Sequence, residues 1–238
     1  MNHASGTNLT RFGCRGLAVV AVLCLPALSD AQVWVGGSTP RRGSVEISGG
    51  ALVTAGQSLP SQAATLTVNP STGLSSFDLF TSNPSLGPAL GAQGTVTVYI
   101  TRAFAVEGGM QFSRPRLDVE LSGDAEDAPD ITASTTITEY VFSGSLVYHF
   151  GTAARTMPFV AAGAGHLRDV HTGNELVETG TEYHGKAGLK IWFADPRRPR
   201  RLGLRMEAGL SVRNGGFNFD DDERRMAPTG AVSLLYLF

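Results

Sequence analysis

The last twelve residues of the chain constrain its fold more than any other stretch. They run from Ala227 to Phe238 and alternate with a period of two, so one face carries Val232, Leu234, Tyr236 and Phe238. The other face carries Thr229, Ala231, Ser233, Leu235 and Leu237. Chain ends usually fray in water, and an unpaired apolar strand edge promotes aggregation. A closed transmembrane barrel removes both difficulties, because its last strand pairs with its first and the apolar face meets lipid.

Residues 1–31 have the features of a secretory signal peptide. Arg11 and Arg15 supply the positive charge, and residues 16–28 form an apolar run of the usual length. Small residues at Ser29 and Ala31 predict cleavage after Ala31. The apolar run is too short to cross a membrane as a helix, which needs roughly 20 residues.

The composition of the remaining chain argues against disulfide bonds and against nucleic-acid binding. Both cysteines, Cys14 and Cys24, lie in the predicted leader, so no disulfide is available after cleavage. The leader also removes two of 19 basic residues and one of 21 acidic residues, which leaves 17 against 20 and a net charge of −3. A near-neutral charge gives no support for nucleic-acid binding, and we expect none.

Eight later segments alternate between apolar and polar residues as strands do. Long and short connections between them also alternate, with long loops expected at 56–91 and 115–135 and a tight turn at 102–103. Outer-membrane barrels share this asymmetry, and an even number of strands puts both termini in the periplasm. In the second long loop Leu117, Val119 and Leu121 continue the alternation, which predicts that the third strand extends past the membrane. The predicted strands are 44–55, 92–101, 104–114, 136–150, 158–170, 181–193, 201–213 and 227–238.

Two features resemble a known family. The terminal Phe238 with Tyr236, Leu234 and Val232 is similar to the C-terminal signature of bacterial outer-membrane barrels, and the strand pattern resembles the small OmpA/OmpX-type barrels. The resemblance implies an all-β fold, an antiparallel up-and-down transmembrane barrel of about eight strands at 44–238, preceded by a lead-in at 32–43. It also implies an outer-membrane location, contact with lipid and lipopolysaccharide, and recognition of the last strand by the insertion machinery. We expect a monomer.

The charged residues predicted on the inward faces are the main candidates for a functional site. An eight-stranded barrel is just wide enough for side chains to fill it, so isolated charges inside it must pair or meet water. We therefore predict a network of ion pairs that closes the lumen. Its predicted members are Glu46, Glu107, Glu139, Arg168, Lys186, Lys190, Arg205, Glu207 and Arg213.

Two other groups of residues invite a chemical interpretation. Ser143, Ser145, His149 and Glu139 are the residue types of a hydrolytic triad, but they share one strand and cannot close on one another. His166 and His184, with His171, could meet across a hairpin and bind zinc, although their spacing matches no metal motif. We expect no catalytic residue, no metal and no cofactor.

The sequence thus predicts an outer-membrane barrel with a structural or surface-interaction role, a closed lumen and no catalysis. Three alternatives stay open at this point: a narrow ion or solute pore, a lipid A-modifying enzyme on the same fold, and a soluble periplasmic lipid-binding barrel. The sequence does not identify the ligands of the exposed loops.

Overall fold

The computed structural model describes residues 40–66, 77–125, 128–151, 155–171, 176–193, 202–215 and 224–238. The predicted signal peptide and residues 32–39 of the lead-in lie outside this part of the chain. Within it, no helix has the length and apolar character needed to cross a membrane. The strands are β1 (Val45–Thr54), β2 (Gln57–Ser58), β3 (Gln62–Leu66), β4 (Phe77–Leu86), β5 (Ala89–Tyr99), β6 (Phe104–Ser113), β7 (Arg116–Ser122), β8 (Ile131–His149), β9 (Thr156–His171), β10 (Val177–Trp192), β11 (Leu202–Gly215) and β12 (Arg225–Leu237).

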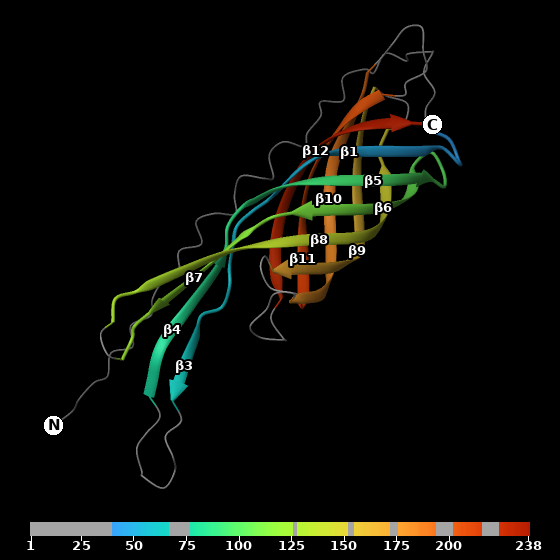
Figure 1. The fold of residues 1–238 in the computed structure, drawn as a ribbon. Helices are drawn as coiled ribbons and strands as arrows, with labels where there is room; N and C mark the ends of the chain where they lie inside the picture. The colour runs from blue at the N-terminus through green and yellow to red at the C-terminus, as the bar shows by residue number, and fades with distance from the viewer. Residues whose placement is uncertain are drawn as a thin grey trace, which may run out of the picture. The chain divides into compact units, whose positions relative to one another are not determined.

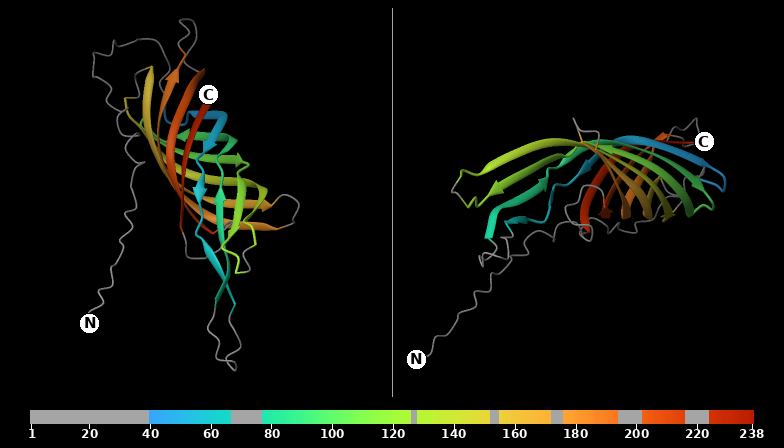
Figure 2. Two further views of the ribbon diagram at one scale, coloured as in Figure 1. Left: turned by 90° about the vertical axis from the view of Figure 1, so that its left-hand side faces the viewer. Right: turned by 60° about the horizontal axis from the view of Figure 1, so that its bottom comes forward.

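Eight of these strands form a closed antiparallel barrel. Following the hydrogen bonds, the order is β1, β5, β6, β8, β9, β10, β11 and β12, and β12 pairs back with β1. At the seam the backbone N–H of Phe238 donates to the carbonyl of Val45 at 2.8 Å. Figures 1 and 2 show β1 beside β12 at this seam. The predicted all-β eight-stranded barrel, closed by its last strand, is confirmed.

The period-two pattern of each strand separates the lumen from the outer wall. On β11, Arg205 and Glu207 are buried while Met206 between them is exposed. On β12, Ser233 and Leu235 are buried whereas Leu234 is 58% exposed. Because successive side chains of a strand point to opposite faces, one register places the charges inside and the apolar residues on the outer wall.

Aromatic side chains form two belts on the outer wall. The belt nearest the start of β1 and the end of β12, which we call the terminal end, includes Phe104, Tyr148, Phe150, Tyr236 and Phe238, with ring contacts at 4.8 Å. At the other end the Phe112 and Tyr140 rings lie 5.4 Å apart. Tyr140 and Tyr148 are eight residues apart on β8, so the belts are separated by roughly 20 Å at a strand tilt near 40°. Such spacing is of the order of the apolar band of an outer membrane.

Four strands form a second sheet that continues one end of the barrel, which we call the extension end. Strand β8 links the two sheets, since residues 131–136 pair with β7 and residues 137–149 pair with β9 (Figure 1). Strand β7 pairs with β4, which pairs in turn with β2 and β3. The prediction of a loop at 56–91 is wrong, because most of its described residues form β2, β3 and β4. The alternation at Leu117 and Val119 does continue as a strand, β7.

Candidate functional site

The centre of the lumen is occupied by Arg205, whose side chain is fully buried. Its guanidinium group spans the two carboxylate oxygens of Glu107 on β6, with Nη2 2.9 Å from Oε1, and its Nε donates to Glu207 at 2.7 Å. Thr97 donates to Glu107 at 2.7 Å, and Gln93 donates to Glu207 at 3.0 Å. The carboxylates therefore have several donors each, as buried charges require.

A second buried ion pair lies closer to the terminal end. Lys190 Nζ contacts the two carboxylate oxygens of Glu46 at 2.7 and 2.9 Å. The Tyr99 hydroxyl donates to Glu46 at 2.8 Å and accepts from Lys190 at 3.1 Å. The ammonium group also lies over the rings of Tyr99 and Phe159, at 5.5 and 5.4 Å from their centroids. This layer joins β1, β5, β9 and β10 across the lumen.

Apolar side chains fill the lumen below this pair, at the terminal end. Trp192, Tyr99 and Phe159 are the largest of them. Because these side chains are almost completely buried, they leave little room for water around the Lys190–Glu46 pair. The whole cluster comprises Tyr99, Ala105, Val147, Met157, Phe159, Ala161, Trp192, Leu235 and Leu237.

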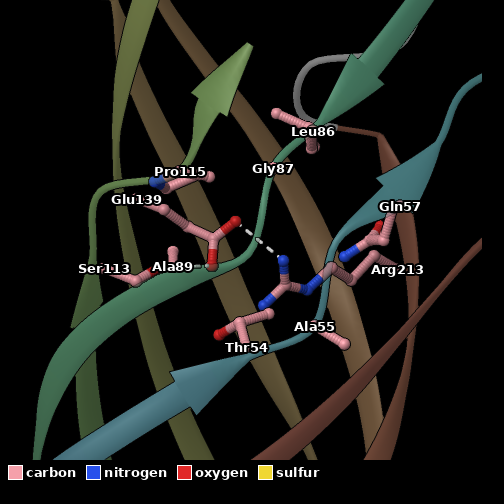
Figure 3. A pocket seen from close by; sticks show the side chains of 10 residues that line it. All are labelled: Thr54, Ala55, Gln57, Leu86, Gly87, Ala89, Ser113, Pro115, Glu139 and Arg213. Atoms are coloured by element: carbon pink, nitrogen blue, oxygen red, sulfur yellow. Dashed lines mark hydrogen bonds and ion pairs between the residues drawn. The ribbon is translucent and has the colours of Figure 1, made fainter. Parts of the chain in front are cut away.

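A third ion-pair layer lies near the extension end and centres on Arg213. This side chain donates to Glu139 at 2.7 Å and to Glu182 at 2.9 Å, and Glu139 also accepts from Ser113 at 3.1 Å. Figure 3 shows Arg213 and Glu139 facing each other beside a cavity of about 10 Å³. A space of that size holds at most about one water molecule.

Above this layer an apolar cluster covers the mouth of the barrel. It consists of Leu59, Leu86, Leu117 and Ile137, all buried, with Val119 packed against them. Three of these residues come from β4, β7 and β8, and Leu59 follows β2. The second sheet thus supplies an apolar cap over the charged lumen, and no part of this cap was predicted.

The Ser145 hydroxyl has a histidine partner in the lumen, although not the one on its own strand. Its Oγ lies 2.8 Å from Nε2 of His184, and Nδ1 of His184 lies 3.6 Å from Glu182 Oε1. All three side chains are buried. Glu182 is at the same time held by Arg213, so the group is part of the packed interior.

Eight of the nine residues predicted for the lumen network are placed in the lumen and have a charged partner there. Lys186 is the most weakly held, at 3.6 Å from Glu207. Arg168 is the exception. It lies on the exposed outer wall of β9, and the prediction that it faces the lumen is wrong.

The error for Arg168 comes from a reversed assignment of the two faces of β9. Apolar side chains of a membrane barrel are expected to face lipid, yet Phe159 and Leu167 are buried in the lumen with 1% and 0% exposure. The inward acid on this strand is Asp169, which lies 4.0 Å from Arg225 of β12. Where a layer of the lumen is apolar, the inward residues of a strand resemble its lipid-facing residues. The sequence then does not show which face of the strand points into the lumen.

The remaining sequence candidates are separated in space. His166 lies on the exposed outer wall and His184 in the lumen, so the barrel wall stands between them. His149 stacks on Tyr99 at 5.1 Å and lies away from Ser145 along β8. The side chains of the C-terminal signature all point to the outer wall, with exposures of 50, 58, 36 and 65% for Val232, Leu234, Tyr236 and Phe238.

The second sheet presents mostly polar residues. Across β7 and β8, the Ser134 hydroxyl and the Arg116 guanidinium both donate to Asp118. The hydrogen bond from Ser134 and the nearby Arg116 lower the pKa of the Asp118 carboxyl below its ordinary value. The carboxylate is therefore the form that this exposed surface presents at neutral pH.

Comparisons with known proteins give matches only at the level of structure. No protein-family model and no curated protein sequence matches the chain. The outer membrane protein OprG from Pseudomonas aeruginosa aligns with a TM-score of 0.51 and 12% identity over 83% of this chain and 97% of that one. Neisserial surface protein A aligns with a TM-score of 0.43 and 12% identity, over 82% of this chain and 97% of that one. Ail, the attachment invasion locus protein of Yersinia pestis, aligns with a TM-score of 0.40 and 15% identity, over 83% of this chain and 99% of that one. The match to OprG and the closed order of the strands therefore show that the chain has the fold of a small eight-stranded outer-membrane β-barrel.

Proposed function

We propose that this protein is an integral outer-membrane barrel with a closed lumen, no catalytic activity and a surface-interaction role carried by its second sheet. Both termini face the periplasm in this proposal. The barrel acts as a membrane anchor, and the sheet of β2, β3, β4, β7 and the first part of β8 meets the surroundings of the cell.

The observation that carries the closed lumen is the set of stacked layers inside the barrel. From the terminal end these are the apolar cluster around Trp192, the Lys190–Glu46 pair, the Arg205 group, the Arg213 group and the cap around Leu117. Each ion-pair layer connects strands that face each other across the lumen. An ion that crossed the barrel would have to displace several desolvated pairs in succession, which is costly in a medium of low dielectric constant.

The orientation follows from the unequal ends of the barrel. At the terminal end a short turn through Arg102 connects β5 to β6. At the extension end the chain makes a further sheet, whose residues are largely polar. Outer-membrane barrels keep short turns in the periplasm and longer segments outside, so the second sheet belongs on the cell surface.

The absence of catalysis is part of the proposal because the nucleophile candidate is enclosed. Ser145 and His184 are 8% and 6% exposed, and their side chains point into the packed lumen. A lipid substrate in the membrane would meet the apolar outer wall instead.

Bilayer conductance tests the closed lumen. Protein is extracted from outer membranes, and a gel run with and without boiling shows whether its migration changes. Protein that passes this test is reconstituted into planar bilayers. We expect a barrel that shows the boiling-dependent shift and no stable channel. A matched variant, Arg205→Ala, removes the central charge and supplies a sensitive comparison, because any leak should appear there first. Stable channels formed by the unmodified protein would contradict the closed lumen and support the narrow ion or solute pore.

A further inference from the structure

The outer wall near the extension end carries two basic side chains that have no partner in the described part of the chain. Arg168 and His166 on β9 are exposed, and neither makes a hydrogen bond or ion pair with another described residue. The described outward-facing positions of the eight barrel strands carry no acidic side chain near them. Arg168 is thus a positive charge on a wall that is otherwise apolar or neutral.

Neighbouring strands place polar donors beside these two residues. The register pairs Arg168 with Thr179 and His166 with Thr181, and it pairs Thr181 with Asn214 of β11. Together with the backbone of Gly180 and Gly215, His166 and these three polar residues line an open depression of about 380 Å³. The result is a hollow with one imidazole, two hydroxyls and one amide, and Arg168 is the cross-strand neighbour of Thr179 in its lining.

The position of this hollow relative to the membrane follows from the aromatic belt. Arg168 is the cross-strand neighbour of Tyr140, and His166 is the neighbour of Phe142. Aromatic belts mark the level of the lipid head groups. An arginine on the outer wall costs about 2–4 kcal/mol at the midplane of the membrane and about 0–1 kcal/mol near its surface, so the belt is the level at which Arg168 is tolerated.

We propose that the surface formed by Arg168, His166, Thr179, Thr181 and Asn214 binds a phosphate-bearing sugar head group of lipopolysaccharide in the outer leaflet. A guanidinium group can hold two phosphate oxygens at once, and no acidic side chain at the described outward-facing barrel positions competes for it. Hydroxyl and amide groups suit the sugar that carries the phosphate, while the apolar wall below the hollow accommodates acyl chains. This inference rests on the proposed function, because the extension end must face the outside for the hollow to meet the outer leaflet.

The test compares two forms of one lipid. Protein is extracted from outer membranes into amine-oxide detergent, which contains no phosphate, and is stripped of bound lipid. Lipid A with both phosphates, and the same lipid A after phosphatase treatment, are titrated into it by calorimetry. Arg168→Gln is the informative variant. Arg102→Gln is its control, since it removes the same charge from the turn at the terminal end. Arg168→Lys keeps the positive charge but loses the ability to donate two hydrogen bonds to one phosphate group at the same time.

We expect the unmodified protein and Arg102→Gln to bind phosphorylated lipid A more tightly than the dephosphorylated form. Arg168→Gln should bind the phosphorylated form about fivefold more weakly, the effect of one surface arginine on an anionic head group, and should bind the dephosphorylated form unchanged. Arg168→Lys should fall between the two.

Two results would overturn the inference. One is equal affinity of the unmodified protein for both lipids, and the other is a loss in Arg168→Gln no larger than that in Arg102→Gln. The boiling-dependent gel shift is recorded for every sample. A barrel that shifts but does not distinguish the lipids contradicts only the lipid site, whereas recovery of the protein in the soluble fraction without a shift contradicts the proposed function.

Discussion

Arg205 on β11 and Glu107 on β6 are joined by two parallel hydrogen bonds across the lumen, although 98 residues separate them in the chain. The guanidinium also holds Glu207 and lies over the ring of Phe159, 4.6 Å from its centroid. One side chain thereby connects strands on different sides of the barrel. Arg205 is the nearest cation to both carboxylates, so the packing of the lumen depends on this one side chain.

Replacement of Arg205 by alanine should therefore destabilise the barrel strongly. Two buried carboxylates would lose their main donor, and such a loss lowers the free energy of unfolding by about 3–5 kcal/mol. Urea unfolding in detergent, followed by the loss of the faster-migrating band in unboiled samples, measures this. The double variant Arg205→Met with Glu107→Leu should recover part of the loss, because it leaves only one carboxylate, Glu207, without its main donor. If Arg205→Ala were as stable as the unmodified protein, this residue would not have the central role that we assign to it.

A second prediction concerns the contact between Gly188 of β10 and Phe159 of β9. A Cβ atom at Gly188 would lie 2.5 Å from the Phe159 ring and would also clash with the carbonyl oxygen of Met206. Gly188→Ala should lower the free energy of unfolding by about 1–3 kcal/mol, since the ring and the wall must shift. Gly108→Ala is the matched control, because a Cβ there meets nothing within 4 Å and we expect little change. Equal unfolding midpoints for the two variants would show that the wall near Phe159 yields easily.

The alternation in the sequence was sufficient for the barrel itself but not for everything inside it. Strands such as β11 alternate strictly, and the residues around Arg205 were placed in the lumen because charges cannot face lipid. The prediction for Arg168 reverses the two faces of β9, because Phe159 belongs to the apolar cluster at the terminal end and Leu167 is an apolar residue buried in the lumen. Polarity distinguishes the two faces of a strand only where the lumen is polar.

The second sheet was missed for a different reason. Residues 56–91 are rich in serine, threonine, glycine and proline, a composition that indicates a loop when it is considered alone. Pairing with β7 supplies the strand partners that the composition does not reveal. The Leu86–Leu117 contact that caps the barrel joins segments predicted as separate loops, so it depends on tertiary structure. Tyr99 did carry a signal, because it shares the polar face of β5 with Thr95 and Thr97.

A variant at the contact between Ser145 and His184 can distinguish a structural role of this pair from a catalytic one. Ser145→Ala would leave the buried Nε2 of His184 without its partner, and an unsatisfied buried group costs about 1–3 kcal/mol. We expect a lower unfolding midpoint and an unchanged lipid A mass profile in cells that carry the variant. Ser143→Ala, on the same face of β8, serves as a control for loss of a hydroxyl. Altered lipid A in Ser145→Ala alone would revive the enzymatic interpretation.

The last prediction concerns Phe238, which is exposed on the outer wall beside Tyr236, with its backbone already used in the seam. If the insertion machinery recognises this terminal ring, Phe238→Ala should reduce the amount of barrel assembled in the outer membrane several-fold. The purified variant should unfold within about 1 kcal/mol of the unmodified protein, because an exposed ring contributes little to packing. Leu202→Ala is the matched control, since Leu202 is the cross-strand neighbour of Tyr236 and 48% exposed but lies outside the C-terminal strand. Assembly in cells is measured as the fraction of the protein that shows the boiling-dependent shift, and stability is measured on purified barrels in urea. Equal assembly of the two variants would mean that the terminal ring serves the lipid belt alone, and a parallel loss of stability in Phe238→Ala would mean that it supports the seam.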